Sequence, residues 1–391
     1  MHLMMERDMT EGIFKSGDIF AGRADIYRLA EELRIPERKI IDFSSPVNPL
    51  GVSKKIKAEI RRHLKYLNNY PDPETKRLSQ KLAQYHGISP AGVICGNGAS
   101  ELLHLIIKTL RPRTVLIPSP SSPGYESAVL SVRDYGGWSE EPQVAYLMLK
   151  GPEGFEIKPG EFIGAMREQS ASPDFARHSM LSGALAFLCN PNNPTGRLLN
   201  KGDIRKIAES AKELGWHLVV DEALIDFCPG NSVIEDVADN PYLIVLRTQS
   251  YFHALAGLRI GYGVFPPDLS ERLRAVREPL TVNSLAQRAA ALAVKDRVYE
   301  RETLKLVSQE KRFLERSFKK LGLDYFPSDA NFYLLKTGNA NEIGVELKRN
   351  GILLRDFSNV RGLGSGYLGI AVKSHRENAI LVRELTDILL K

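Results

Sequence analysis

The chain has 391 residues, enough for one large domain and a smaller one with a substantial core. Apolar residues make up 43% and charged residues 26%, as in ordinary water-soluble globular proteins, and the net charge of +6 is small for this length. Lys and Arg are spread without long like-charge runs, and no apolar stretch approaches the roughly 18 residues of a membrane span. Neither a nucleic acid nor a membrane is therefore expected as a partner.

The three cysteines, Cys95, Cys189 and Cys228, are too few for a disulfide framework, and none belongs to a Cys-x-x-Cys pair. Reduced thiols, no metal site and a cytoplasmic location are expected. Residues 1–10 are polar and charged, which does not fit a secretion signal.

Apolar runs that read as buried strands alternate with helical patterns along most of the chain. The strands are expected at residues 114–118, 185–189, 217–221 and 242–246, and helices at 99–110 and 201–215. This alternation predicts an α/β fold with a mostly parallel sheet between helices.

From about residue 266 the pattern changes to long helices, followed by alternating segments near residues 331–335 and 367–372. A smaller α+β domain is expected there. The predicted division is an N-terminal arm at residues 1–41 that joins the small domain, a large α/β domain at 42–275 and the small C-terminal domain at 276–391.

The stretch at residues 95–101, CGNGASE, follows an apolar strand and opens a helix. Free backbone N–H groups and the positive end of the helix dipole make such a turn an anion site. Gly-rich turns of this kind are common, so the stretch alone is weak evidence.

A second, more specific turn follows the next expected strand at residues 190–196, NPNNPTG. Its prolines and glycine fix the backbone and leave the amide of Asn193 free to donate. Asp221 then ends another strand, at the edge of an α/β sheet where ligands bind. A helix N-cap is an equally good interpretation of Asp221 alone.

A third stretch, at residues 246–262, reads LRTQSYFHALAGLRIGY. Together and in this order the three stretches and Asp221 resemble the fold-type I enzymes that depend on pyridoxal 5'-phosphate. Segments at 68–73 (NNYPDP), 329–332 (DANF) and 354–364 (LRDFSNVRGLG) narrow the resemblance to the branch of L-threonine-O-3-phosphate decarboxylases and histidinol-phosphate aminotransferases. It covers nearly the whole chain and implies a seven-stranded sheet, a homodimer and a link to cobalamin assembly.

The resemblance also implies roles for individual residues. Asp221 would pair with the pyridinium nitrogen of the cofactor, and Asn193 with its phenolic oxygen. Tyr70 would reach a phosphate across the dimer interface, while Arg355 and Arg361 are candidates for anionic groups of the substrate or for surface ion pairs. The cofactor phosphate would be surrounded by Ala99, Ser100, Thr248, Ser250 and Arg259.

One position departs from the family in a way that bears on catalysis. The lysine that forms a Schiff base with the cofactor is replaced by Tyr251, and no lysine occurs between Lys212 and Lys295. A phenol cannot form a Schiff base, and its ordinary pKa near ~10 makes it a poor base. His253 is an alternative proton carrier, or a residue used only for packing.

Three further departures accompany Tyr251. Ser122 and Leu224 stand where the family has aromatic residues, and Gly369 replaces an arginine that grips the substrate carboxylate. Two hypotheses remain: a non-catalytic or strongly impaired threonine-phosphate decarboxylase homologue that binds cofactor non-covalently or another phosphorylated ligand, or an active decarboxylase or aminotransferase for a phosphorylated amino acid.

Overall fold

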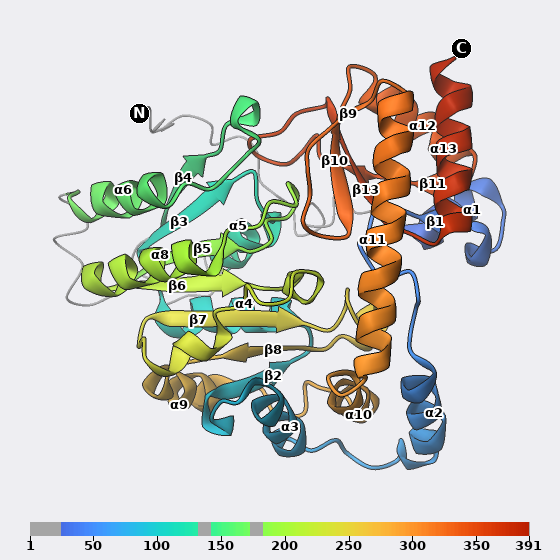
Figure 1. Cartoon of the computed structure of the whole chain (residues 1–391). Helices are drawn as coiled ribbons and strands as arrows, with labels where there is room; N and C mark the ends of the chain where they lie inside the picture. The colour runs from blue at the N-terminus through green and yellow to red at the C-terminus, as the bar shows by residue number, and fades with distance from the viewer. Residues whose placement is uncertain (1–24, 132–141, 173–182, 391) are drawn as a thin grey trace.

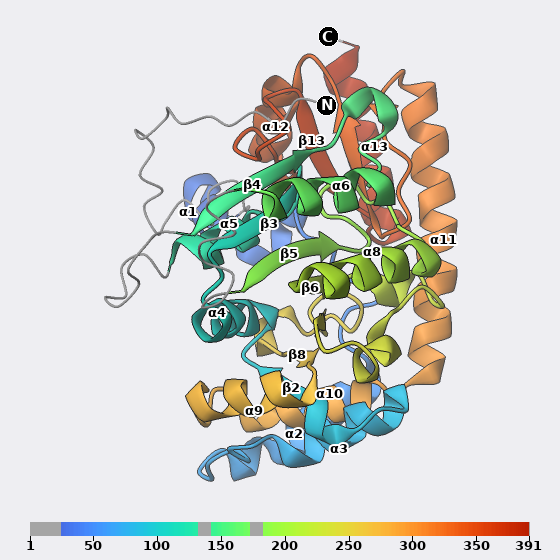
Figure 2. The same ribbon diagram turned by 90° about the vertical axis from the view of Figure 1, so that its left-hand side faces the viewer.

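The computed structural model describes residues 25–131, 142–172 and 183–390. Figures 1 and 2 show a large sheet with helices on both faces, and beside it a smaller sheet that packs on the C-terminal helices. Residues 1–24 of the expected N-terminal arm lie outside the described residues.

The large sheet has seven strands in the order β2-β8-β7-β6-β5-β3-β4. Strand β8 runs antiparallel to both of its neighbours, and the other pairs are parallel. The bounds are β2 Val93–Gly96, β3 Thr114–Ser119, β4 Gln143–Met148, β5 Ala184–Cys189, β6 Trp216–Asp221, β7 Leu243–Thr248 and β8 Gly261–Val264.

Each face of this sheet carries its own apolar core. Helices α4 (Ala99–Leu110), α5 (Pro123–Leu130) and α9 (Pro267–Val276) cover one face. Helices α3 (Lys76–His86), α6 (Pro159–Ser170), α8 (Lys201–Leu214) and α10 (Ser284–Ala293) cover the other, and α2 (Lys54–His63) packs against α10. Because both faces are buried, the central strands are mostly apolar.

The small sheet is antiparallel, in the order β12-β13-β10-β9. Its core lies against three helices, α11 (Arg297–Lys320), α12 (Ala340–Arg349) and α13 (His375–Leu389). Its strands are β9 Asp324–Tyr325, β10 Phe332–Lys336, β12 Arg355–Asp356 and β13 Tyr367–Ala371. Figure 1 shows α11 running past both sheets.

The described part of the arm begins with α1 (Ile26–Leu33) and continues into β1 (Ile41–Asp42). Strand β1 pairs in parallel with β11 (Ile352–Leu353). This pairing agrees with an arm that joins the C-terminal region, while the exact domain boundaries stay a prediction.

The expected fold is confirmed: a mostly parallel sheet between helices with a smaller α+β unit. The predicted helix at 99–110 coincides with α4, and the helix predicted at 201–215 ends one residue earlier. There Gly215 adopts φ 71°, a conformation that terminates helices. Within the described part of the chain, none of the helices is long and apolar enough to cross a membrane.

Candidate functional site

Most of the residues that the sequence predicts for the cofactor lie at one edge of the large sheet, where the parallel strands end. Strand β2 leads into α4 through Gly98, which has φ 84° and caps the helix without a side chain. The first amides of α4, at Ala99 and Ser100, have no carbonyl of their own helix to bond. They face outward from the positive end of the helix dipole, which suits an anion.

Arg259 brings a positive charge to the same turn. A Cβ placed on Gly98 would lie 2.6 Å from Nη2 of Arg259, so the guanidinium rests against the glycine backbone. Gly261 permits a similarly close approach, because its Cβ would lie 2.5 Å from the Ala99 nitrogen. Two glycines therefore let the arginine and strand β8 pack against the helix start.

Two hydroxyl side chains lie beside this turn at the end of β7. Thr248 pairs with Gly261 across the β7–β8 ladder, and its Oγ1 lies 2.9 Å from Oγ of Ser250. Both residues are buried. The turn after Gly98, the guanidinium and these hydroxyls together form an anion cup, by which we mean Ala99, Ser100, Thr248, Ser250 and Arg259.

Asp221 ends β6, next to this cup. Its Oδ2 accepts a hydrogen bond of 2.7 Å from the Tyr125 hydroxyl, and its Oδ1 accepts one of 3.0 Å from the Ala223 amide. Tyr125 is fully buried and its ring stacks on Phe187 with centroids 4.6 Å apart. Burial raises the pKa of Asp221, whereas the bond from Tyr125 favours the ionised form. The bond to Ala223 is not an N-cap of a regular helix, because the next helical turn begins only at Ile225.

The loop at 190–196 starts beside Asp221, since the Asn190 amide donates to the Asp221 carbonyl at 2.9 Å. The Asn190 side chain holds the loop through Leu199, and that of Asn192 donates to Pro120. Among the described residues, none forms a hydrogen bond with the side chain of Asn193. The loop thus leaves Asn193 for a ligand.

Tyr251 directly follows Ser250 and packs against the apolar cluster that contains Leu224 and Phe252. Its carbonyl accepts a 2.9 Å hydrogen bond from the Asn48 amide, and the Asn48 side chain donates to the Phe252 carbonyl at 2.7 Å. These bonds fix the backbone at Tyr251.

Residues next to Asp221 and Thr248 point to the opposite face of the sheet, as alternation along a strand requires. Asp221 is in register with Leu246, which belongs to the core under α4 and α5. Arg247 is in register with Tyr262, which belongs to the core under α3 and α10. His253 lines a cavity on that second face together with Arg247, and Asp221 is not part of its wall.

The candidate substrate residues lie further out. Arg355 is in register with Gly369 on β13. Arg361 has its guanidinium 4.1 Å from the ring centroid of Tyr146 and 3.5 Å from Glu126. Its carbonyl accepts from Ser119 at 2.8 Å, which ties this segment to the end of β3. Tyr70 is 87% exposed in the single chain.

Two of the altered positions have visible local roles. Ser122 caps α5 by accepting from the Gly124 amide at 3.3 Å. At Gly369, an added Cβ would lie 2.6 Å from Cε2 of Phe357 and 2.9 Å from Cβ of Arg355. Neighbouring side chains therefore occupy the space that a larger residue at 369 would need.

Sequence reasoning missed Tyr125 and the partners of Arg247. Tyr125 lies three residues beyond Ser122, at the start of α5, and nothing in its immediate sequence announces a bond to a residue 96 positions away. Arg247 sits inside an apolar strand, and a charge in such a place is a usable signal for a buried ion pair.

The donors and acceptors at this edge suit one kind of molecule. The cup offers backbone amides, hydroxyls and a guanidinium to a phosphate, and Asp221 offers a carboxylate to a protonated ring nitrogen. Asn193 adds an amide for a polar substituent on the same ring. A phosphorylated, nitrogen-containing aromatic ring fits these groups.

The sequence is similar to known proteins over most of its length. The family of class I and II aminotransferases matches residues 38–385. A histidinol-phosphate aminotransferase of Caldanaerobacter subterraneus subsp. tengcongensis is 33% identical over 326 residues, covering 83% of this chain and 85% of the relative. The threonine-phosphate decarboxylase of Salmonella typhimurium is 30% identical over 370 residues, covering 93% and 95%.

Solved structures agree with these sequence matches. The crystal structure of the histidinol-phosphate aminotransferase from Clostridium acetobutylicum superposes with a TM-score of 0.78 and 26% identity, covering 90% of this chain and 99% of that one.

Proposed function

The chain belongs to the class I and II aminotransferase family, and from that premise we propose that it binds pyridoxal 5'-phosphate without a covalent bond and is inactive or strongly impaired as a catalyst. The observation that carries this proposal is the contrast between an intact set of polar groups, Asp221, Asn193 and the anion cup, and the absence of any lysine from residue 213 to 294.

When bound, pyridoxal phosphate supplies an electron-withdrawing ring. Asp221 keeps the ring nitrogen protonated, and Tyr125 holds that carboxylate ionised and in place. Asn193 donates to the phenolic oxygen. Arg259 would offer a positive charge to the phosphate, and the amides of Ala99 and Ser100 would donate hydrogen bonds to it. All of these contributions are binding and orientation.

Proton transfer at the reacting carbon is the step that this chain is proposed to lack. Tyr251 stands where an amine is needed, and a phenol with an ordinary pKa near ~10 holds its proton at neutral pH. His253 is neutral because burial lowers its pKa, but it lines the cavity on the other face of the sheet. We therefore propose that His253 transfers no proton on the face of the sheet where Asp221 lies.

The names of the relatives suggest a phosphorylated amino acid or amino alcohol as the second ligand, with Arg355 and Arg361 as its anion contacts. The same names favour a second candidate function, an active decarboxylase or aminotransferase for threonine phosphate or histidinol phosphate that uses a different base. The decarboxylase would serve cobalamin assembly.

Absorbance spectroscopy with borohydride reduction separates the two candidates. Pyridoxal phosphate added to the protein should keep the spectrum of the free aldehyde or its hydrate while being retained on dialysis. Reduction should leave no cofactor on the peptide at 246–262. Tyr251→Lys should produce a reducible covalent adduct, and Tyr251→Phe, the matched control, should not.

Turnover of threonine phosphate or histidinol phosphate by the unaltered protein would favour the second candidate over the first. A reduced adduct mapped to another lysine would show that the amine comes from elsewhere. Failure of the cofactor to bind at all would remove both candidates.

We also propose a homodimer with the cup near the subunit interface. Tyr70 is 87% exposed in the single chain, and the exposed apolar side chains Leu64, Tyr66 and Leu67 precede it closely. Such a patch is typical of an interface. Light scattering should give twice the chain mass; a stable monomer at micromolar concentration would contradict the proposal.

A further inference from the structure

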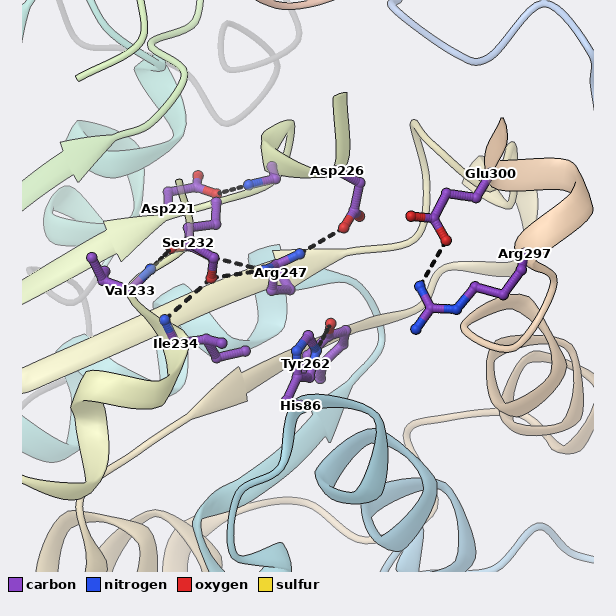
Figure 3. A network of polar contacts seen from close by, with 12 residues as sticks. His86, Asp221, Asp226, Ser232, Val233, Ile234, Arg247, Tyr262, Arg297 and Glu300 are labelled. Carbon is purple, nitrogen blue, oxygen red and sulfur yellow. Dashed lines mark hydrogen bonds and ion pairs between the residues drawn. The ribbon is translucent and has the colours of Figure 1, made fainter. Parts of the chain in front are cut away.

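A second cavity lies on the face of the large sheet opposite Asp221. It measures about 240 Å³ and is bounded by the end of α3, the segment at 225–235 and the junction of α10 with α11. At ~30 Å³ per water, this volume holds roughly eight waters, or a small organic molecule. Figure 3 shows the polar groups at its inner end.

Arg247 is the central cation of this wall, and its charge is already paired with carboxylates. It is only 4% exposed, and Nε donates to Glu222 at 2.8 Å while Nη1 donates to Asp226 at 2.7 Å. Its Nη2 donates to Ser232 at 2.9 Å. One guanidinium therefore faces two carboxyl groups. Burial raises the pKa of Glu222, but the hydrogen bonds that it accepts from Arg247, Ser232 and Val233 favour its ionised form, which leaves this inner end with a net negative charge.

The other charged side chains that line the cavity have ion-pair partners, among them Glu235, which lies 3.8 Å from Lys201. Glu300 accepts from Arg297 at 2.8 Å, and Asp296 from Lys55 at 2.8 Å. His86 is neutral, because burial lowers its pKa to about 3. The uncompensated charge thus belongs to Glu222 and Asp226, and of these two only Asp226 lines the cavity.

Asp226 has capacity for a further donor. Arg247 bonds to Oδ1, and no described residue donates to Oδ2. The Asp226 side chain is 21% exposed and lines the cavity. Figure 3 shows its carboxylate directed toward Arg247, with Glu300 to the side of this pair.

His253 belongs to the same wall and has a ring nitrogen without a partner among the described residues. It is 8% exposed, and its Nδ1 is buried without a hydrogen-bond partner among the described residues. Burial lowers the pKa of His253, so the ring is neutral and has a nitrogen that can accept. A buried polar atom left unpaired costs free energy, which a bound donor would recover.

Apolar side chains complete the wall. Ile225, Phe252 and Val294 line the cavity beside the polar end. A ligand with a cationic donor at one end and a short hydrocarbon chain would match both parts, since the chain avoids contact with water there.

We propose that this cavity is a binding site for a small aliphatic amine, whose ammonium group donates to Oδ2 of Asp226 and to the acceptor nitrogen of the His253 ring while its chain packs on Phe252 and Val294. The site is separate from the proposed cofactor site and does not depend on it, because it uses the other face of the sheet and none of the cup residues.

Isothermal titration calorimetry of the full chain tests this site, with n-butylamine as the ligand and n-butanol as its uncharged counterpart. Butylamine should bind at millimolar concentration or below, and butanol should not. His253→Phe keeps an aromatic ring but removes the acceptor, and Asp226→Asn keeps an oxygen for Arg247 but removes the charge. Each should weaken butylamine binding about tenfold or more.

Glu235→Gln is the matched control, because Glu235 is 67% exposed at the rim of the same cavity. It should change the affinity less than about twofold. Circular dichroism checks folding, and if Asp226→Asn fails to fold, His253→Phe decides. No heat of binding for the unaltered protein, equal binding of the two ligands, or unchanged affinity in folded His253→Phe would overturn the proposal.

Discussion

Neighbouring residues in this chain serve different faces of one sheet. Asp221 meets Tyr125 on one side, and Glu222 meets Arg247 on the other. The same alternation separates Thr248, which belongs to the anion cup, from Arg247. At this edge, consecutive residues of one strand therefore point to opposite faces of the sheet and have different partners.

The first residue-scale prediction concerns Arg259. Arg259→Ala removes the guanidinium beside Gly98 and should weaken binding of a phosphate-bearing ligand by about 1.5–3 kcal/mol, the range for hydrogen bonds to charged groups. Titration with pyridoxal phosphate measures the change. Arg272→Ala is the control, because Arg272 bonds to Thr109 at the other end of α4. Equal losses in both variants would show that the cup is not the phosphate site.

The second residue-scale prediction concerns Tyr125. Tyr125→Phe keeps the ring that stacks on Phe187 but removes the donor to Asp221, so the pKa of Asp221, already raised by burial, should rise further. Because the cofactor needs the ionised carboxylate, its affinity should fall by about 1–2 kcal/mol. On acidification, binding should be lost at a higher pH than in the unaltered protein.

Fluorescence titration of pyridoxal phosphate across a pH series measures this shift. Tyr299→Phe provides the comparison, since the Tyr299 hydroxyl donates to the Gly51 carbonyl and not to a carboxylate. Superimposable pH profiles for Tyr125→Phe and the unaltered protein would mean that Tyr125 does not control Asp221.

Local motifs predicted Asp221 and Asn193, because proline, glycine and a strand end fix the backbone where these side chains emerge, whereas Arg259 was predicted only from the resemblance to a family. The partners of such residues could not be predicted in this way. Tyr125 reaches Asp221 only after β3 and β6 have assembled into one sheet, and Arg247 finds Asp226 only when the loop after β6 folds back. The roles assigned to the site residues remain predictions.

At the scale of secondary-structure elements, the central strands were predictable and the short outer ones were not. Strands buried on both faces give continuous apolar runs, as in β5, where every residue is buried. The two-residue strands β1, β11 and β12 carry no pattern of their own. They are defined only by their partners.

Strand β13 gives an element-scale prediction. Gly369→Arg should destabilise the protein by about 1–3 kcal/mol, because a side chain at 369 would meet Phe357 and Arg355 on the neighbouring segment. Phe357→Ala in the same chain should cancel part of this cost, since the two residues compete for one space. Urea unfolding of the single and double variants measures the coupling.

Gly344→Ala is the control substitution. Gly344 lies inside α12, and its Cβ would make only an ordinary contact, 3.9 Å from Leu368. Alanine should therefore stabilise the helix by about 0.5–1 kcal/mol. Strictly additive effects of Gly369→Arg and Phe357→Ala would show that the crowding at 369 is not real.

At the scale of the whole molecule, acid should lower the free energy of unfolding by favouring protonation of imidazoles that are buried in the folded state. Burial lowers the pKa of His86 to about 3 and that of His217 to about 4. Between these values and the ordinary pKa near ~6.5, the unfolded chain binds more protons than the folded one, so stability is complete above this window and falls as the pH drops through it. Lowering the pH from about 7 to about 5 should cost about 2 kcal/mol per ring.

Urea unfolding at a series of pH values measures this loss. His86→Gln retains an acceptor for the Tyr262 hydroxyl, 2.8 Å from the native ring nitrogen, and should reduce the pH dependence. His104→Gln, at an exposed position on α4, should leave it unchanged. An identical slope in His86→Gln and the unaltered protein would contradict the assignment to this ring.

Helix α11 connects the two units without a break over 24 residues, from Arg297 at the second cavity to Phe318 in the core of the small sheet. A helix turns by about 100° per residue. Inserting one residue midway would rotate Leu314 and Phe318 away from their core while leaving Arg297 in place. The rotational register of α11 therefore matters for the packing of both units. Residues can be added to the chain at the ends of this helix, such as the turn at Gly322, but not within it.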